Sequence, residues 1–411
     1  MAYAVVRQTL SATLNGTADF TKAGFGTPTA ALVIMCGASV TANPTTNIGA
    51  MSIGFWDGTV SPQSQSVVEI GMAIGTTSQV SRHSSDSDIA AQVQGGSAIL
   101  FAAYTASAIA DGIRLTLTVD ATGVQRLCTV LLFDCDARLI TFTPNGTQDA
   151  TAESESLGFS PKLVLFGSIG ASPADLAQAN FCQISFGFAA DDGTNRAVSF
   201  IAAGLSATEV LNFRFWEDRC VGQTGTWAGE ATLGVDTFTM TTRDGATAGD
   251  VCFALALGGD VEFDSGTLST PTAIGDQEYE TDVTPEALLL VASNATGTAM
   301  HEDSGANGFA IGMADADGEF SHNFTAMDAA DPTRVSAAQH ATQVLDLDTQ
   351  SGSPGELTAV CDATVAFNAA DFTLDFSVVD SVARKGWWIA FGQAPAAASE
   401  PILVMATRSA P

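Results

Sequence analysis

One acidic run in the last third of the chain has the spacing of metal ligands. Asp315-Ala316-Asp317-Gly318-Glu319 places three carboxylates at alternate positions around a glycine. Such a bent run can offer several hard oxygens to Ca²⁺. It lacks the full loop of an EF-hand, and an acidic hairpin turn needs no metal. Asp315, Asp317 and Glu319 are therefore candidate calcium ligands, with a plain turn as the alternative, and we expect no other cofactor.

Three tryptophans are candidates for binding sugars. We expect Trp56, Trp216 and Trp227 in or beside loops, where indole faces can stack on a glycan. The alternative is that they pack in a core or an interface, as large aromatic side chains commonly do. Trp387 and Trp388 are adjacent in a predicted strand, so at least one must be buried.

The remaining reactive residues form no catalytic pattern. No two of the four histidines have the spacing of metal ligands on a helix. There is no G-x-S-x-G nucleophile motif and no glycine-rich phosphate loop with its lysine. Seven scattered cysteines, never in C-x-x-C spacing, indicate free thiols. We expect no enzymatic activity. The histidines are His83, His301, His322 and His340.

The charge of the chain is one-sided and excludes several partners. There are 15 basic and 45 acidic residues, a formal net charge of −30. Phosphate groups are bound by clustered Lys and Arg, so we expect neither nucleic-acid binding nor attraction to anionic membranes. No apolar run is long enough to cross a bilayer, and the start MAYAVVRQTL lacks the pattern of a secretory signal. We therefore expect synthesis in a cytoplasm and no membrane insertion.

The elements that would position these residues recur three times along the chain. A proline opens an apolar strand in each copy, and 26, 26 and 27 residues later a glycine lies inside a strand that leads into an acidic turn. Proline suits the first residue of a strand, where its missing N–H costs no ladder bond. The prolines are Pro28, Pro161 and Pro285, and the glycines, called the repeat glycines below, are Gly54, Gly187 and Gly312.

Two strands close each copy. In each pair the first alternates apolar residues with Thr or Asp, which predicts a sheet with one wet face. The second is almost entirely apolar, which predicts a strand buried on both sides. The pairs are Leu115–Val119 with Cys128–Phe133, Phe238–Thr242 with Val251–Leu255, and Phe372–Phe376 with Trp387–Phe391.

Many short strands separated by turn residues predict an all-β chain of three tandem β-sandwich or jelly-roll-like domains. Helical periodicity is scarce, although Ser172–Gln178 and Ala329–Thr342 could form a turn or two of helix. Binding specificity should lie in stretches that differ between copies. These are Ser81–Gln92, Phe213–Trp227 and Ser321–Gln343, and the predicted boundaries are 1–136, 137–259 and 260–392, followed by an extended tail at 393–411.

The second copy resembles β-sandwich domains in structural proteins of tailed bacteriophages, in which a "G-F-x-P-K" strand opens the domain and an apolar "A-L-G-G" strand closes it. The first copy matches less closely, and the third departs from the pattern at Val283–Glu286 and Phe391–Gln393. The resemblance implies a virion component and supplies no catalytic residues. It is carried by Leu157–Phe166, by Ile184–Phe188 with Ala197–Ser199, and by Val251–Gly259.

From these observations we expect a non-enzymatic virion protein exposed on the particle surface: a tail fibre, a head spike or a capsid decoration. Its partners would be other virion proteins and further copies of itself in a trimer or ring, since closed symmetry supplies interfaces. The alternative function is that of a glycan-binding module, in which the protein would contribute to host adsorption by binding a glycan on the host surface. A polysaccharide depolymerase is a third, less supported function.

Overall fold

The chain forms β-strands throughout the part that its computed structural model describes, and no helix occurs there. The described residues are 3–39, 48–60, 64–73, 79–94, 99–120, 125–169, 176–179, 181–203, 211–223, 227–244, 251–297, 301–302, 307–327, 334–350 and 357–394. Most of the predicted tail at 393–411 therefore lies outside them.

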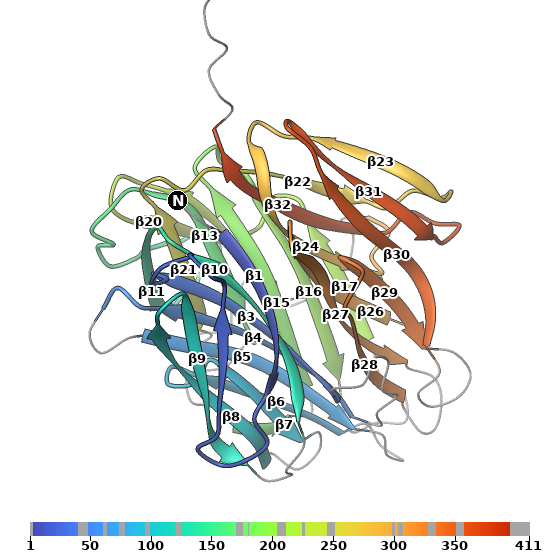
Figure 1. Cartoon of the computed structure of the whole chain (residues 1–411), viewed down its shortest axis with the longest axis horizontal. Helices are drawn as coiled ribbons and strands as arrows, with labels where there is room; N and C mark the ends of the chain where they lie inside the picture. The colour runs from blue at the N-terminus through green and yellow to red at the C-terminus, as the bar shows by residue number, and fades with distance from the viewer. Residues whose placement is uncertain are drawn as a thin grey trace, which may run out of the picture.

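The first repeat consists of a large and a small antiparallel sheet (Figure 1). Its large sheet has the order β1-β10-β3-β4-β5-β6 and its small sheet the order β2-β9-β8-β7. The strands are β1 (Tyr3–Leu10), β2 (Thr17–Thr21), β3 (Ala30–Ser39), β4 (Ile48–Asp57), β5 (Ser64–Ala73), β6 (Gln79–Ser85), β7 (Ala90–Gln94), β8 (Ile99–Ile109), β9 (Gly112–Asp120) and β10 (Arg126–Phe133).

The second repeat follows the same order. Its large sheet is β11-β21-β13-β15-β16-β17 and its small sheet is β12-β20-β19-β18. The strands are β11 (Asp136–Phe142), β12 (Thr151–Glu153), β13 (Pro161–Ser168), β15 (Phe181–Ala190), β16 (Asn195–Ala203), β17 (Leu211–Trp216), β18 (Val221–Gln223), β19 (Trp227–Leu233), β20 (Phe238–Asp244) and β21 (Cys252–Gly258).

The third repeat has the large sheet β22-β32-β24-β26-β27-β28 and the small sheet β23-β31-β30-β29. Three sandwiches with one topology confirm the predicted fold class. The strands are β22 (Phe263–Ser269), β23 (Gly275–Glu280), β24 (Thr284–Ser293), β26 (Asn307–Asp315), β27 (Gly318–Met327), β28 (Arg334–His340), β29 (Leu345–Gln350), β30 (Leu357–Phe367), β31 (Asp371–Val378) and β32 (Lys385–Gln393).

Each large sheet is buried on both faces. One face packs on its own small sheet, as Val130 and Leu132 of β10 do in the first repeat. The other face enters a core shared by all three repeats, to which β10 contributes Leu131 and Phe133. The prediction that each closing strand is buried on both sides is confirmed for β10, β21 and β32. Burial of apolar surface is the main favourable term in the free energy of folding. The shared core therefore stabilises the association of the three repeats.

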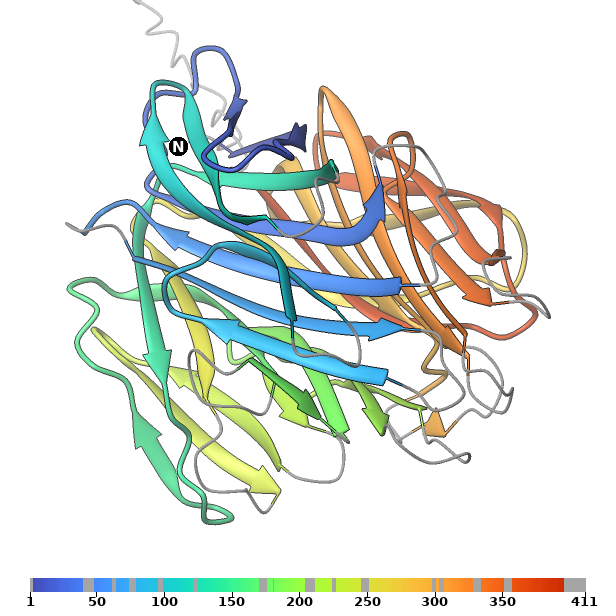
Figure 2. The same cartoon turned by 90° about the horizontal axis from the view of Figure 1, so that it is seen from below.

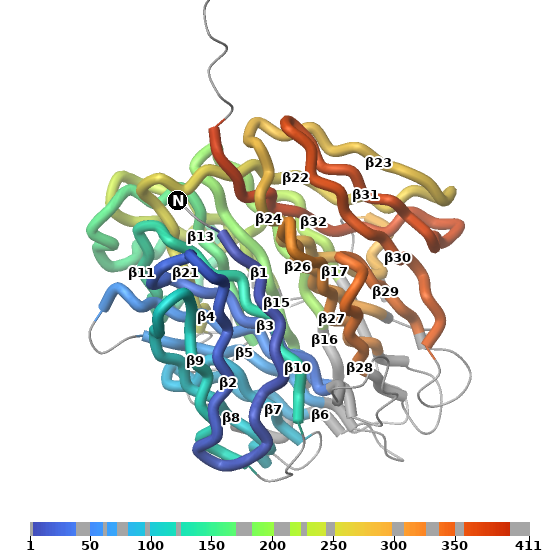
Figure 3. Tube along the Cα trace, in the orientation of Figure 1, coloured from blue at the N-terminus to red at the C-terminus, as the bar shows by residue number. Residues whose placement is uncertain are grey.

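Aromatic rings link the repeats within the shared core. Phe55 of the first repeat lies 6.4 Å from Phe186 of the second, measured between ring centroids, and Phe186 lies 5.3 Å from Trp387 of the third. Phe133 of the first repeat packs edge-on against Phe391 of the third at 5.3 Å. In Figure 2 the blue, green and orange-red thirds of the chain surround a common centre. The same grouping can be followed along the tube in Figure 3. The sandwiches form a ring and not a row.

Strand exchange strengthens two junctions of this ring. β14 (Leu176–Ala179), from the second repeat, pairs with the edge strand β6 of the first. β25 (His301–Glu302), from the third repeat, pairs with the edge strand β17 of the second. The helical interpretation of Ser172–Gln178 is wrong over its described part, because an open sheet edge offers β14 a ladder partner that no local pattern reveals.

The third junction closes the ring. β28 of the third repeat lies against β3 and β4 of the first, and Cys36 donates its thiol hydrogen to the carbonyl oxygen of Ala338, 3.3 Å away. The helical interpretation of Ala329–Thr342 is also wrong where the structure describes it, since β28 occupies Arg334–His340 as an edge strand of the large sheet. Residues 40–47, between β3 and β4, lie outside the described residues.

The repeat glycines are explained by a close approach of two backbones. At each repeat glycine, the backbone that leads into an edge strand of the small sheet passes directly over the large sheet. A Cβ at Gly54 would lie 1.6 Å from the carbonyl oxygen of Ile89, and one at Gly312 would lie 1.6 Å from that of Val344. At Gly187 the corresponding distance to the carbonyl oxygen of Cys220 is 2.4 Å. Only glycine fits these crossings, since real Cβ contacts are never so short.

Candidate functional site

Two carboxylates join neighbouring repeats at equivalent positions. Asp57 and Asp315 each lie three residues after a repeat glycine. Asp57 accepts a hydrogen bond of 3.1 Å from the backbone nitrogen of Leu139, on the first strand of the second repeat. Asp315 accepts one of 2.9 Å from the backbone nitrogen of Val5, on the first strand of the first repeat. Both carboxylates are buried, so they act as structural connections around the ring.

The three residues predicted to bind calcium at the third acidic turn contact other groups of the protein, and the calcium site there stays a prediction. Lys22 of the first repeat donates to Asp315 at 3.0 Å and also pairs with Asp317, so a lysine ammonium contacts two of the three candidate ligands. Glu319 accepts a hydrogen bond of 2.8 Å from the backbone nitrogen of Val365, on the small sheet. Asp315 and Asp317 thus share Lys22, whereas Glu319, on the strand after the turn, has a partner of its own.

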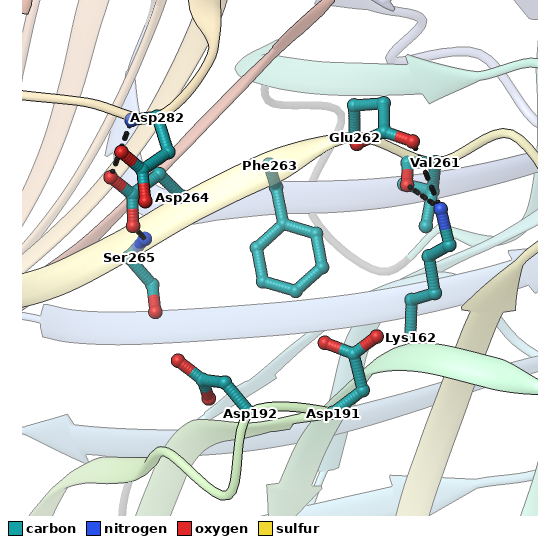
Figure 4. A pocket seen from close by; sticks show the side chains of 9 residues that line it. All are labelled: Lys162, Asp191, Asp192, Val261, Glu262, Phe263, Asp264, Ser265 and Asp282. Atoms are coloured by element: carbon teal, nitrogen blue, oxygen red, sulfur yellow. Dashed lines mark hydrogen bonds and ion pairs between the residues drawn. The ribbon is translucent and has the colours of Figure 1, made fainter. Parts of the chain in front are cut away.

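At the junction between the second and third repeats the equivalent position is Ala190, which carries no carboxylate. A pocket of about 230 Å³ lies there. In Figure 4, Asp191 and Asp192 face Asp264 and Glu262 across the ring of Phe263. Lys162 bonds Glu262 at 3.0 Å, and burial raises the pKa of Asp191 above its ordinary value. The pocket is acidic, and the carboxylate of Asp264 accepts hydrogen bonds from the backbone nitrogens of Ser265 and Asp282.

Two of the three tryptophans proposed to bind sugars are buried. Trp56 is 0% exposed in the core of the first sandwich, and Trp216 is 3% exposed. The indole nitrogen of Trp216 donates to the hydroxyl of Ser199 at 3.2 Å, and Arg214 covers its ring. For Trp56 and Trp216 the structure shows the alternative expected from the sequence, packing within a buried cluster, which leaves no indole face open to a sugar. Trp227 lies in β19, but its side chain is outside what the structure describes.

The structure instead brings together three aspartates of the third repeat that the sequence analysis did not select. Asp346 and Asp348 lie on β29, and Asp362 lies directly opposite Asp346 on β30. One carboxylate oxygen from each lies within 4.8 Å of the other two. Asp346 and Asp348 are buried and Asp362 is half-buried, so one side of this aspartate cluster reaches solvent.

The cluster perturbs its own protonation. Burial, followed by the charges of Asp348 and Asp362, raises the pKa of Asp346 well above its usual range. Burial and Asp362 raise the pKa of Asp348 to about 7. Burial likewise raises the pKa of Asp362, against the opposing effect of His340. Without a bound cation these carboxyl groups therefore retain protons at pH values where ordinary aspartates are ionised.

Asn323 of β27 faces the cluster from the large sheet. It is 0% exposed, and its amide is close enough to lower the pKa of Asp346 and Asp348. The amide nitrogen thus acts on the carboxylates, although it lies outside the geometry of a full hydrogen bond, and the carbonyl oxygen accepts no hydrogen bond among the described residues. The nearby His340 places its Nε2 atom 3.2 Å from an oxygen of Asp346, and burial lowers the pKa of His340, which favours the neutral imidazole.

The position of Asn323 is polar in all three repeats, but its partners differ. Glu69, Ser199 and Asn323 each lie two residues after the partner of a repeat glycine in the neighbouring strand. Glu69 accepts a hydrogen bond from the backbone nitrogen of Val93, and Ser199 accepts one from Trp216. In the first two repeats a protein atom thus donates a hydrogen bond to this buried group, whereas the carbonyl oxygen of Asn323 accepts none among the described residues. Asn323 and His340 belong to Ser321–Gln343, one of the stretches predicted to carry specificity.

Among the described residues no helix is long and apolar enough to cross a membrane. No protein-family model matches the sequence, and the search of curated proteins returned no significant match.

Proposed function

We propose that this chain is a non-enzymatic structural protein on the surface of a bacteriophage virion. The observation that carries the proposal is the ring of three like sandwiches around one shared core. A single chain of this kind presents three similar outer surfaces around an approximate threefold axis. Symmetric particles have threefold points, where such a chain can contact three equivalent neighbours at once.

Among the virion roles expected from the sequence, the ring favours a decoration protein or a compact spike over an extended fibre. A fibre would place tandem domains end to end, whereas here each large sheet buries one face against the other two repeats. The ring also supplies within one chain the interfaces that a trimer would supply between chains. The proposed partners are therefore other virion proteins, with one chain as the repeating unit.

A glycan-binding role in host adsorption is not part of this proposal. Two of the three tryptophans that would form its stacking surface are buried. The acidic pocket beside Asp191 and Asp264 offers one partly buried aromatic ring, that of Phe263, and no tryptophan among its lining residues.

The proposal is tested on particles that lack the chain. Phage particles from a deletion strain are mixed with the purified full-length chain and sedimented, and bound protein is quantified. We expect saturable binding to the deletion particles, with the chain also found by mass spectrometry in purified wild-type particles. Wild-type particles, whose sites are filled, are the matched control and should bind little added chain. Absence of the chain from wild-type particles would contradict the proposal.

A further inference from the structure

We infer that the third repeat binds one calcium ion between Asp346, Asp348, Asp362 and Asn323. This inference is independent of the proposed virion role, because it rests on the side chains between β27, β29 and β30 alone. The site differs from the acidic turn at Asp315, whose carboxylates are occupied by Lys22.

The spacing of the oxygens fits one ion of this size. Calcium binds oxygen ligands at about 2.3–2.6 Å, so two ligands on opposite sides of the ion are about 4.6–5.2 Å apart. The three aspartate oxygens all lie within 4.8 Å of one another. A single central cation can therefore contact all three without a rearrangement of the strands.

The charge of the cluster calls for a cation. Asp346 and Asp362 are direct cross-strand neighbours, and like charges in that position destabilise a sheet. None of the ion pairs found in the described residues joins Lys or Arg to any of the three aspartates. The nearby basic group is His340, whose Nε2 atom lies 3.2 Å from an oxygen of Asp346 and contacts that aspartate alone among the three. When all three carboxylates are ionised, a divalent cation would compensate two of their three negative charges.

Asn323 supplies independent support for a ligand. A buried amide without hydrogen bonds costs free energy, so native proteins rarely leave one unsatisfied. The Asn323 amide is fully buried and faces the carboxylates, whose pKa its hydrogen bonding lowers, while its carbonyl oxygen accepts no hydrogen bond in the described chain. An ion at the centre of the cluster would take its carbonyl oxygen as a fourth side-chain ligand. At the same position in the other repeats, Glu69 accepts a hydrogen bond from the backbone nitrogen of Val93 and Ser199 accepts one from Trp216.

The donor set selects the class of metal. Three carboxylates and one amide carbonyl are hard oxygen ligands, which suit Ca²⁺ and Mg²⁺ and not the softer transition metals. Calcium tolerates irregular geometry with six to eight ligands, whereas magnesium requires a near-ideal octahedron. Four side chains from three strands of two sheets form an irregular set. The half-buried side of Asp362 leaves room for water to complete the coordination.

The test measures calcium binding by the full-length chain after metal removal. Isothermal titration with CaCl₂ at about 0.15 M salt, where surface attraction is screened, should show one saturable site per chain. Saturating Ca²⁺ should raise the Tm by about 3 °C over the chelator-treated protein. Asp348→Asn and Asp362→Asn should each abolish both effects. Mg²⁺ at the same concentration should give the smaller rise in Tm.

Glu69→Gln is the matched control, because it removes a buried acid at the position in the first repeat that corresponds to Asn323. It should keep the wild-type calcium response. If Asp348→Asn fails to fold, the Asp362→Asn variant provides the test of calcium binding. The Asp362 side chain is half-buried, so its substitution should disturb the fold less. The inference is overturned if the wild-type protein shows no single saturable calcium site. It is also overturned if Asp362→Asn binds calcium and gains Tm as the wild type does. A larger rise with Mg²⁺ overturns the choice of calcium.

Discussion

The carboxylate of Asp315 accepts a hydrogen bond from the backbone nitrogen of Val5, 2.9 Å away on the first strand of the chain. The two residues are 310 positions apart, and their contact joins the third repeat to the first. Asp57 makes the equivalent contact with Leu139 between the first and second repeats. These bonds, together with the shared core, turn a tandem sequence into a ring.

Asp315→Ala should lower the free energy of unfolding by about 2 kcal/mol, because it leaves the buried N–H of Val5 without an acceptor. Urea unfolding monitored by tryptophan fluorescence measures the change. Asp317→Ala is the control, since that side chain is 72% exposed and shares the same lysine. It should cost less than about 1 kcal/mol. Equal losses in the two variants would refute the structural role of Asp315.

Gly312→Ala should destabilise the chain by about 3 kcal/mol or more, because the added Cβ would meet the carbonyl oxygen of Val344 at 1.6 Å. The backbone of the edge strand would have to move away from the large sheet. Gly297→Ala is the control, since a Cβ there meets no atom within 4 Å. Thermal unfolding should show a large loss for the first variant and almost none for the second. A well-folded Gly312→Ala protein with wild-type Tm would contradict the close crossing.

In the absence of calcium, the contribution of the aspartate cluster to stability should fall as the pH rises from about 4 to about 7. Folding raises the pKa of Asp348 to about 7 and raises that of Asp346 and Asp362, so these three groups bind more protons in the folded chain than in the unfolded chain in this window. Deprotonation then favours unfolding. Asp348→Asn should flatten the fall, measured by urea unfolding at several pH values in chelator. Exposed Asp317→Asn should keep the wild-type slope, and an unchanged slope in Asp348→Asn would be inconsistent with the cluster.

The purified chain should be a monomer of 42.1 kDa in solution, because the ring closes within one chain. Size-exclusion chromatography with light scattering gives the mass directly. A stable species of three times this mass would instead support the trimer expected from the sequence.

The repeated framework could be predicted from the sequence because its residues have local causes. Pro161 is the first residue of β13, and Gly54 and Gly312 stand where backbones cross. The apolar closing strands have a composition that indicates burial on both faces. None of these features specifies how three sandwiches meet. That depends on contacts such as Phe186 with Trp387, about 200 residues apart, which leave no periodic signal.

The aspartate cluster was missed for a similar reason. Asp346 and Asp348 alternate with Leu345 and Leu347, which indicates a strand with one acidic face. The third carboxylate, Asp362, joins them only through the register of β29 and β30. The acidic turn at Asp315 gave a stronger local pattern, but Asp315 and Asp317 form ion pairs with Lys22, which is distant in the sequence. Local spacing identified acidic residues, and the pairing of strands decided which of them meet.

A cryo-electron microscopy map of the intact particle tests the central claim most directly. The proposal predicts density for the chain on the outer surface, with its three sandwiches arranged around a threefold point and each contacting a neighbouring virion protein. Density that places the three sandwiches in a row, or a particle without the chain, would contradict it.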